Sequence, residues 1–129
     1  MATPDQLKGA IETYIERFSA GDSAAWTACF AEDATHEDPV GTERHHGHDA
    51  IQASYEQSLA IGGSLHLRAR DQPIIVGHEA VVALEAWSGS GADRVHMPRI
   101  IDHFTFDDAG RITSLRAFWQ IETVRPDPE

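Results

Sequence analysis

The chain lacks the features that mark several classes of protein. Cys29 is its single cysteine, which excludes an internal disulfide framework and a zinc site built from several thiolates. Ten Lys and Arg face 21 Asp and Glu, so the formal net charge is −11, which argues against a nucleic-acid or anionic-membrane partner. No apolar run could span a bilayer, and the N-terminus is polar where a secretory signal would be apolar. We therefore expect a cytoplasmic protein with a small ligand that is not strongly anionic.

What the chain does contain predicts one folded domain covering residues 1–129. Hydrophobic residues make up 41% of the sequence and charged residues 24%, a balance that allows burial of a core and does not indicate disorder. A chain of 129 residues has the usual length of one domain.

The first half of the sequence has helical periodicity. Thr3, Pro4 and Gln6 form an N-terminal capping pattern, and Gly21 ends the first helix. Its apolar positions recur at helical spacing: Leu7, Ile11, Tyr14, Ile15 and Phe18. A second short helix follows, capped by Asp22 or Ser23, and it is expected to carry Trp26, Cys29 and Phe30. An extended segment over 34–41, a polar loop over 44–48 and a third helix from Asp49 to the glycines at 62 and 63 complete this half.

The second half changes to strand periodicity. Alternating or continuous apolar runs predict strands over 65–69, 74–76, 81–87, 95–106 and 112–121, separated by turns. Helices followed by consecutive antiparallel strands predict an α+β fold in which a curved, mostly antiparallel sheet packs on three helices. The mouth of such a sheet is a common place for a small-molecule site.

Strand alternation separates two faces of the segment from Pro98 to Phe106. Arg99, Ile101, His103 and Thr105 share one face, and Ile100, Asp102, Phe104 and Phe106 share the other. Asp102 is thus expected among apolar side chains, where burial raises the pKa of a carboxyl group and keeps it neutral. A neutral carboxylic acid can donate a hydrogen bond to an oxyanion. Taken alone, Asp102 could instead hydrogen-bond a neighbouring strand or pair with a charge that the sequence does not locate.

Three further residues are candidates for the site. Tyr14 and Tyr55 lie on inward helical faces, where two buried phenols could hydrogen-bond each other, although most buried tyrosines only fill a core. Asp38 precedes a proline, which holds its backbone extended; such a pair is often a simple turn, but an ionised Asp38 at a pocket mouth could act as a base.

A metal site and a reactive thiol are both disfavoured. His45, His46 and His48 are expected in an exposed polar loop without matching carboxylate or thiolate spacing. Cys29 lies beside Phe30 in an apolar stretch typical of a packed thiol.

With these residues identified, the sequence resembles the bacterial ketosteroid isomerases (steroid Δ5-isomerases), within the nuclear-transport-factor-2-like, SnoaL-like group of folds. Besides Tyr14 and Tyr55, the resemblance is carried by the segments 30–41, 101–104, 110–112 and 117–119. It implies a cone-shaped domain with an apolar pocket, a homodimer formed through the outer sheet face, and a steroid substrate isomerised without a cofactor or metal.

The resemblance also implies roles for individual residues. Asp38 would be the general base, Tyr14 and protonated Asp102 the oxyanion hole, Tyr55 the residue that orients Tyr14, and Trp119 a pocket residue whose N–H reaches Asp38. The chain departs from the family at His36, where a small aliphatic residue is usual, and at Phe30, where some members have another tyrosine. A protonated His36 near Asp38 would favour the carboxylate and weaken it as a base.

Two other functions remain open. One is a different enzyme with this fold, such as an epoxide hydrolase or a polyketide cyclase. An Asp-Arg-Asp hydrolase would need an arginine between its carboxylates, and Arg99, the nearest candidate, is expected on the face opposite Asp102. A non-catalytic module that binds a hydrophobic ligand would explain the pocket without a role for Asp38.

Overall fold

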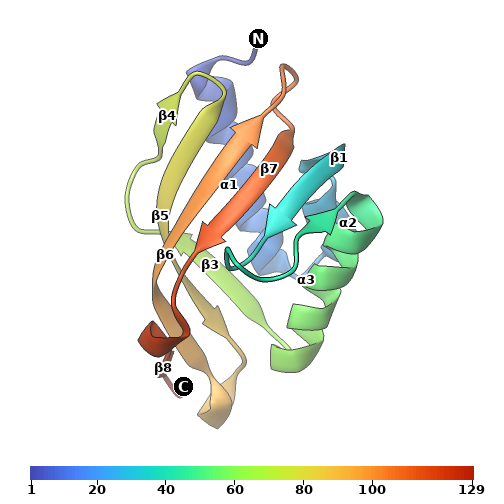
Figure 1. Cartoon of the computed structure of the whole chain (residues 1–129). Coiled ribbons are helices and arrows are strands. Elements are labelled where there is room, and N and C mark those ends of the chain that lie inside the picture. Colours follow the sequence, from blue (N-terminus) through green and yellow to red (C-terminus); the bar gives the residue numbers. More distant parts are fainter.

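The computed structural model describes residues 1–129 as helices packed on one face of a curved sheet (Figure 1). The helices are α1 (Pro4–Ala20), α2 (Ser23–Thr27) and α3 (His48–Gly62). The sheet consists of β1 (Phe30–Glu37), β2 (His45–His46), β3 (Leu65–Ala69), β4 (Ile74–Val76), β5 (Glu79–Ser88), β6 (Val95–Phe106), β7 (Ile112–Phe118) and β8 (Arg125–Pro126). The α+β class is therefore confirmed. None of the helices combines the length and hydropathy that a bilayer crossing requires.

Helix α1 begins and ends where its sequence predicts. The Thr3 side chain accepts a hydrogen bond from the Gln6 backbone N–H, and the Gln6 side chain accepts one from the Thr3 N–H, so two otherwise free N–H groups are satisfied. Gly21 ends the helix with φ of 77°, a left-handed conformation that glycine adopts without steric cost.

The sheet is mixed, with its strands in the order β2-β1-β7-β6-β5-β3. The long strands β5, β6 and β7 are consecutive antiparallel neighbours, whereas β1 lies parallel to β7. This parallel pairing brings the end of the first third of the chain next to its last long strand, β7. Asp38 directly follows β1 and Trp119 directly follows β7, so the two residues meet at the same sheet edge.

Three boundaries differ from the sequence-based expectations. Phe30 begins β1 instead of ending the second helix, because α2 is only five residues long. The segment 44–48 is not simply a loop: His45 and His46 pair with β1 as β2, and α3 begins at His48, one residue earlier than predicted. The last long strand ends at Phe118, and Ile121 begins a 3-10 turn.

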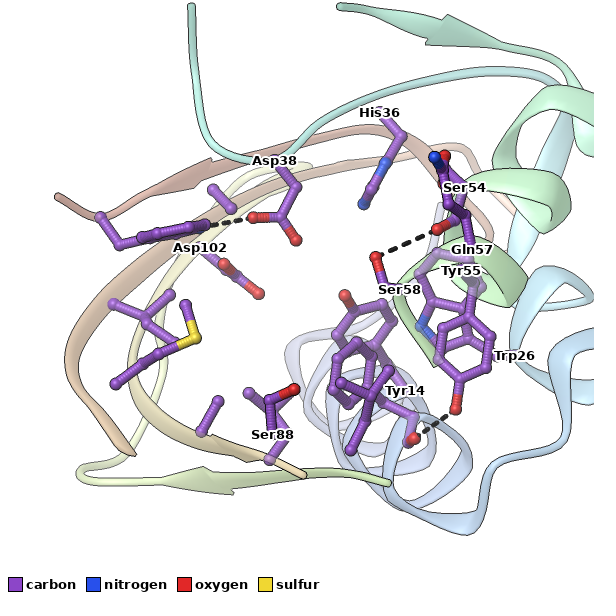
Figure 2. A pocket seen from close by; sticks show the side chains of 18 of the residues that line it. Tyr14, Trp26, His36, Asp38, Ser54, Tyr55, Gln57, Ser58, Ser88 and Asp102 are labelled. Atoms are coloured by element: carbon purple, nitrogen blue, oxygen red, sulfur yellow. Dashed lines mark hydrogen bonds between the residues drawn. The ribbon is translucent and has the colours of Figure 1, made fainter. Parts of the chain in front are cut away.

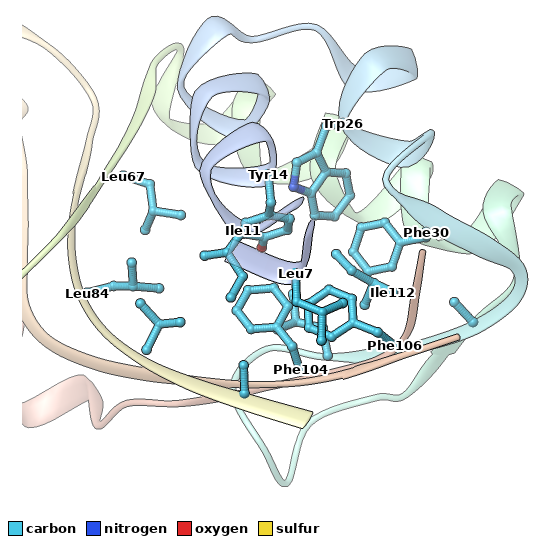
Figure 3. Packing of buried hydrophobic residues seen from close by; sticks show 14 of the residues in the cluster. Leu7, Ile11, Tyr14, Trp26, Phe30, Leu67, Leu84, Phe104, Phe106 and Ile112 are labelled. Atoms are coloured by element: carbon cyan, nitrogen blue, oxygen red, sulfur yellow. The ribbon is translucent and has the colours of Figure 1, made fainter. Parts of the chain in front are cut away.

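The core lies between α1 and the concave face of the sheet (Figure 3). Leu7 and Ile11 of α1 pack toward Phe104 and Leu84 of the sheet, and each of the four is at most 2% exposed. The alternation predicted for β6 is confirmed, because Ile100, Asp102, Phe104 and Phe106 are buried while Ile101 is 44% exposed. This packing closes one end of the helix–sheet layer and leaves a cavity at the other.

Candidate active site

A cavity of about 410 Å³ opens between the helices and the concave sheet face (Figure 2). That volume lies within the roughly 300–1,000 Å³ typical of small-molecule sites. Thirteen of its 21 lining residues are hydrophobic. The lining includes all the acidic and phenolic groups that the sequence singled out: Tyr14, Asp38, Tyr55 and Asp102. Trp119 lines it as well.

Asp102 lies on the inner face of β6, opposite Val82 of β5 and Ala117 of β7, and is 4% exposed. Burial raises its pKa well above the ordinary value of an aspartic acid, and the negative charge of Asp38 raises it further. No cation offsets these effects. Both effects favour the protonated form of Asp102, whose O–H group can donate a hydrogen bond.

Tyr14 projects from α1 into the same cavity, and Figure 2 shows its hydroxyl directed toward the space beside Asp102. Its ring is held edge-on by Phe104 at 5.2 Å between centroids and is only 2% exposed. Burial, followed by the charges of Asp102 and Asp38, raises the pKa of the phenol well above 10. The hydroxyl thus remains a hydrogen-bond donor throughout the physiological pH range.

Tyr55 does not orient Tyr14 in the way that the resemblance implies. Its hydroxyl donates to the backbone carbonyl of Phe18 at 2.6 Å, which is a contact within the helical layer. Trp26 is the residue that packs against Tyr14 here, with 5.9 Å between ring centroids, and its buried indole N–H has no hydrogen-bond partner in the protein. Tyr55 supports this arrangement indirectly, because its ring stacks on Trp26 at 4.9 Å. The sequence identified Trp26 only as an apolar helix position.

Asp38 is bound directly by Trp119. The indole Nε1–H donates to Asp38 Oδ1 at 2.6 Å, the contact that the family resemblance implies. Burial raises the pKa of Asp38, while the Trp119 hydrogen bond and the nearby His45 lower it. Asp38 is an exposed residue whose carboxyl group adjoins the cavity (Figure 2), so the carboxyl group is accessible to a ligand there.

His36 does not carry the positive charge that the sequence analysis considered for it. Its side chain is 5% exposed, and burial together with His45 lowers its pKa to about 4, so the imidazole is neutral at neutral pH. The histidine that acts on Asp38 is His45, which stacks on His36 at 6.0 Å and lines the cavity. Sequence periodicity could not find it, because a strand of two residues has no repeat to detect.

The structure provides no hydrolase-type Asp-Arg-Asp arrangement. Arg99 lines a separate groove on the outer face of the sheet with Arg70 and Phe118, and no arginine lines the cavity that contains Asp38 and Asp102. No three His, Cys, Asp or Glu side chains converge on a point that could hold a metal ion.

The fold and cavity define a small α+β protein whose apolar pocket is lined by a few ionisable side chains. Comparison with known proteins places this protein in a family. Residues 11–115 match the SnoaL-like domain, and the chain belongs to this family within the nuclear-transport-factor-2-like fold. It is 36% identical over 114 residues to a steroid Delta-isomerase from Nocardioides simplex, covering 88% of this chain and 89% of that protein.

The structure of this chain is similar to that of SalBIII, an epoxide hydrolase/cyclase-like enzyme with a role in pyran ring formation in the polyether salinomycin. That similarity has a TM-score of 0.86 at 25% identity and covers 98% of this chain and all of SalBIII. The isomerase relative supports assignment of this chain as an isomerase.

Proposed function

We propose that the protein is a steroid Δ5-isomerase that moves the double bond of a 3-oxo-Δ5-steroid to the Δ4 position. The observation that carries this proposal is the convergence of a neutral acid, a phenol and a second, more accessible carboxylate on one apolar cavity. The steroid isomerase relative supports the choice of substrate.

The chemistry is an intramolecular proton transfer. The Asp38 carboxylate removes a proton from the carbon between the ketone and the double bond, and the electron pair passes through the π system to the ketone oxygen. Tyr14 and Asp102 each donate a hydrogen bond to that oxygen in the resulting dienolate. Asp38 then returns the proton to the far end of the dienolate, which gives the conjugated enone and restores the free carboxylate. Atoms and electrons balance without a cofactor, a metal or water.

The two donors contribute more to the rate than the base. General base catalysis typically supplies roughly 10²–10⁴-fold. Each well-placed oxyanion donor in a site that excludes water contributes about 2.7–4 kcal/mol. Since the carbon acid is much weaker than a carboxylic acid, stabilising the dienolate oxygen is the larger part of the task.

The outer sheet face supports a further proposal, that the protein is a homodimer. Ile101 and Phe118 are paired across β6 and β7 and are 44% and 43% exposed, which is unusual for large apolar side chains lying side by side. Sedimentation velocity should show a dimer for the wild type and a monomer for Ile101→Glu. A monomeric wild type would contradict the proposal.

An absorbance assay tests the isomerase proposal directly. A 3-oxo-Δ5-steroid has no conjugated enone, so the purified protein should produce a new ultraviolet band as the Δ4 product forms. Tyr14→Phe should slow this change strongly while leaving binding of the product measurable. A protein that binds the steroid without changing its spectrum would be a binding module, and the proposal would then fail.

The structural similarity to SalBIII favours a cyclase or epoxide hydrolase as the second candidate function. The absence of an arginine from the cavity weighs against the hydrolase form of this candidate. Incubation with a hydroxy-epoxide, followed by mass and chromatographic analysis, separates ring closure, which leaves the mass unchanged, from hydrolysis, which adds one water.

A further inference from the structure

His36 is a buried polar side chain with no hydrogen-bond partner in the protein. It is 5% exposed, and its Nδ1 atom is inaccessible to solvent and makes no hydrogen bond within the protein. Burying a polar group without a partner costs free energy, so such a group usually has a structural or functional explanation. The mechanism proposed above does not use this side chain.

The sealed Nδ1 determines which ring nitrogen carries the proton. A buried N–H without an acceptor costs more than a buried lone pair without a donor, because orphaned N–H groups are the rarer kind in proteins. We therefore assign the proton of the neutral imidazole to Nε2. His36 lines the cavity, and Figure 2 shows its ring pointing into that space between Asp38 and Ser54, so Nε2–H is available to a ligand.

The surroundings of His36 hold the ring in place and keep it uncharged. Trp26 and Phe30 meet it edge-on at 5.6 and 5.9 Å between centroids, and His45 stacks on it at 6.0 Å. Burial is the main effect that lowers the pKa of His36 and so opposes its protonation, and the neighbouring His45 lowers this pKa further. The Nε2–H donor of His36 is therefore rigid and uncharged. It suits a neutral ligand oxygen better than an anionic one, because the Asp38 carboxylate nearby would repel an anion.

The ketone oxygen of the substrate is not the natural acceptor for this donor. A carbonyl oxygen has two lone pairs, and the proposed function assigns both of them to Tyr14 and Asp102. His36 and Asp38 lie on the same face of β1 and its extension, two residues apart, which corresponds to roughly 7 Å along a strand. A second oxygen on the ligand could reach His36 if it lay close to the carbons between which Asp38 transfers the proton.

We propose that His36 forms a subsite for a second neutral oxygen, a hydroxyl or ketone group, on the first or second ring of the steroid. This inference rests on the proposed function, and it narrows the substrate class to steroids that are oxygenated near the migrating double bond.

The test compares ligand binding by the wild type and two variants. Affinities are measured by calorimetry for the parent 3-oxo-Δ4-steroid and for its derivatives with a hydroxyl at ring carbon 2, 4 or 6. His36→Val removes the donor, and His36→Gln keeps an N–H donor at about the reach of Nε2. We expect one derivative to bind His36→Val about fivefold or more weakly than the wild type. The parent should bind the wild type and His36→Val equally, and His36→Gln should recover part of the lost affinity.

The outcomes separate this inference from the proposed function. If His36→Val changed the affinity of the parent and of all three derivatives by the same factor, His36 would be a packing residue and the inference would be wrong. The isomerase proposal would be unaffected, since it is tested by the absorbance change of the parent substrate. If the wild type bound neither the parent nor any derivative, both proposals would fail together.

Discussion

The indole N–H of Trp119 donates to Asp38 Oδ1 at 2.6 Å, joining residues that are 81 positions apart in the chain. The bond exists because β1 and β7 lie parallel and both end at the same edge of the sheet. It leaves one side of the carboxyl group open to the cavity, and it lowers the pKa of Asp38 against the effect of burial, which raises it. A strand pairing thus controls the protonation of the proposed base.

Replacing Trp119 should change the pH dependence of the reaction. The base must be ionised, so activity is present above the pKa of Asp38 and is lost as the pH falls through it. Trp119→Phe removes a donor that lowers this pKa. The acid limb of kcat/KM should therefore move to higher pH in this variant. An unshifted limb would show that the hydrogen bond does not tune the base.

Removing the base should abolish turnover but not binding. Asp38→Asn retains the size of the side chain and cannot accept the proton, so kcat should fall by at least roughly 10²–10⁴-fold while the affinity for the Δ4 product is retained. Asp33→Asn is the matched control, since Asp33 is an exposed carboxylate on β1 that does not line the cavity. Comparable losses of rate in the two variants would argue against Asp38 as the base.

Asp102 should act as a neutral donor, and two variants distinguish this role from that of a carboxylate. Asp102→Leu removes the donor and should lower kcat by about 10²–10³-fold. Asp102→Asn retains an uncharged N–H donor, so its kcat should fall clearly less than that of Asp102→Leu. Steady-state kinetics for the two variants, with circular dichroism to verify folding, would decide the point. If kcat fell equally in Asp102→Leu and Asp102→Asn, hydrogen-bond donation would not be the role of the side chain at position 102.

His36 should make the folded protein less stable in mild acid. Its pKa is lowered from 6.5 to about 4 on folding, so the unfolded chain binds an extra proton between these two values. Stability is therefore complete above pH 6.5 and is lost as the pH falls. Between pH 7 and 5 the loss should be about 2 kcal/mol.

The pH effect of His36 is best measured as a difference. Urea unfolding of the wild type and of His36→Val at pH 7 and pH 5 cancels the contributions of Asp38 and Asp102, whose raised pKa values act in the opposite direction. If the stability difference between the two proteins were the same at both pH values, His36 would not be the group that titrates.

Local patterns in the sequence were sufficient for much of the site. The capping residues Thr3 and Gln6 and the terminating Gly21 define α1, and helical spacing then directs Tyr14 inward. Strand alternation alone predicts that Asp102 is buried among Ile100 and Phe104. These predictions succeed because helix and strand periods depend only on the nearest residues along the chain.

Contacts between distant segments could not be read in the same way. Nothing local indicates that Tyr55 binds the Phe18 carbonyl instead of Tyr14, since both partners are equally compatible with an inward phenol. The neutrality of His36 likewise depends on the rings of Trp26 and His45, which come from α2 and β2.

The sequence by itself therefore determined which side chains face inward, and with that the α+β layering and the membership of the cavity wall. Only the tertiary structure decided how those side chains pair and which of them carry charge. The physical reason is that side-chain direction follows from backbone geometry over a few residues, whereas hydrogen-bond partners and pKa values follow from desolvation and from groups brought together by the parallel β1–β7 pairing.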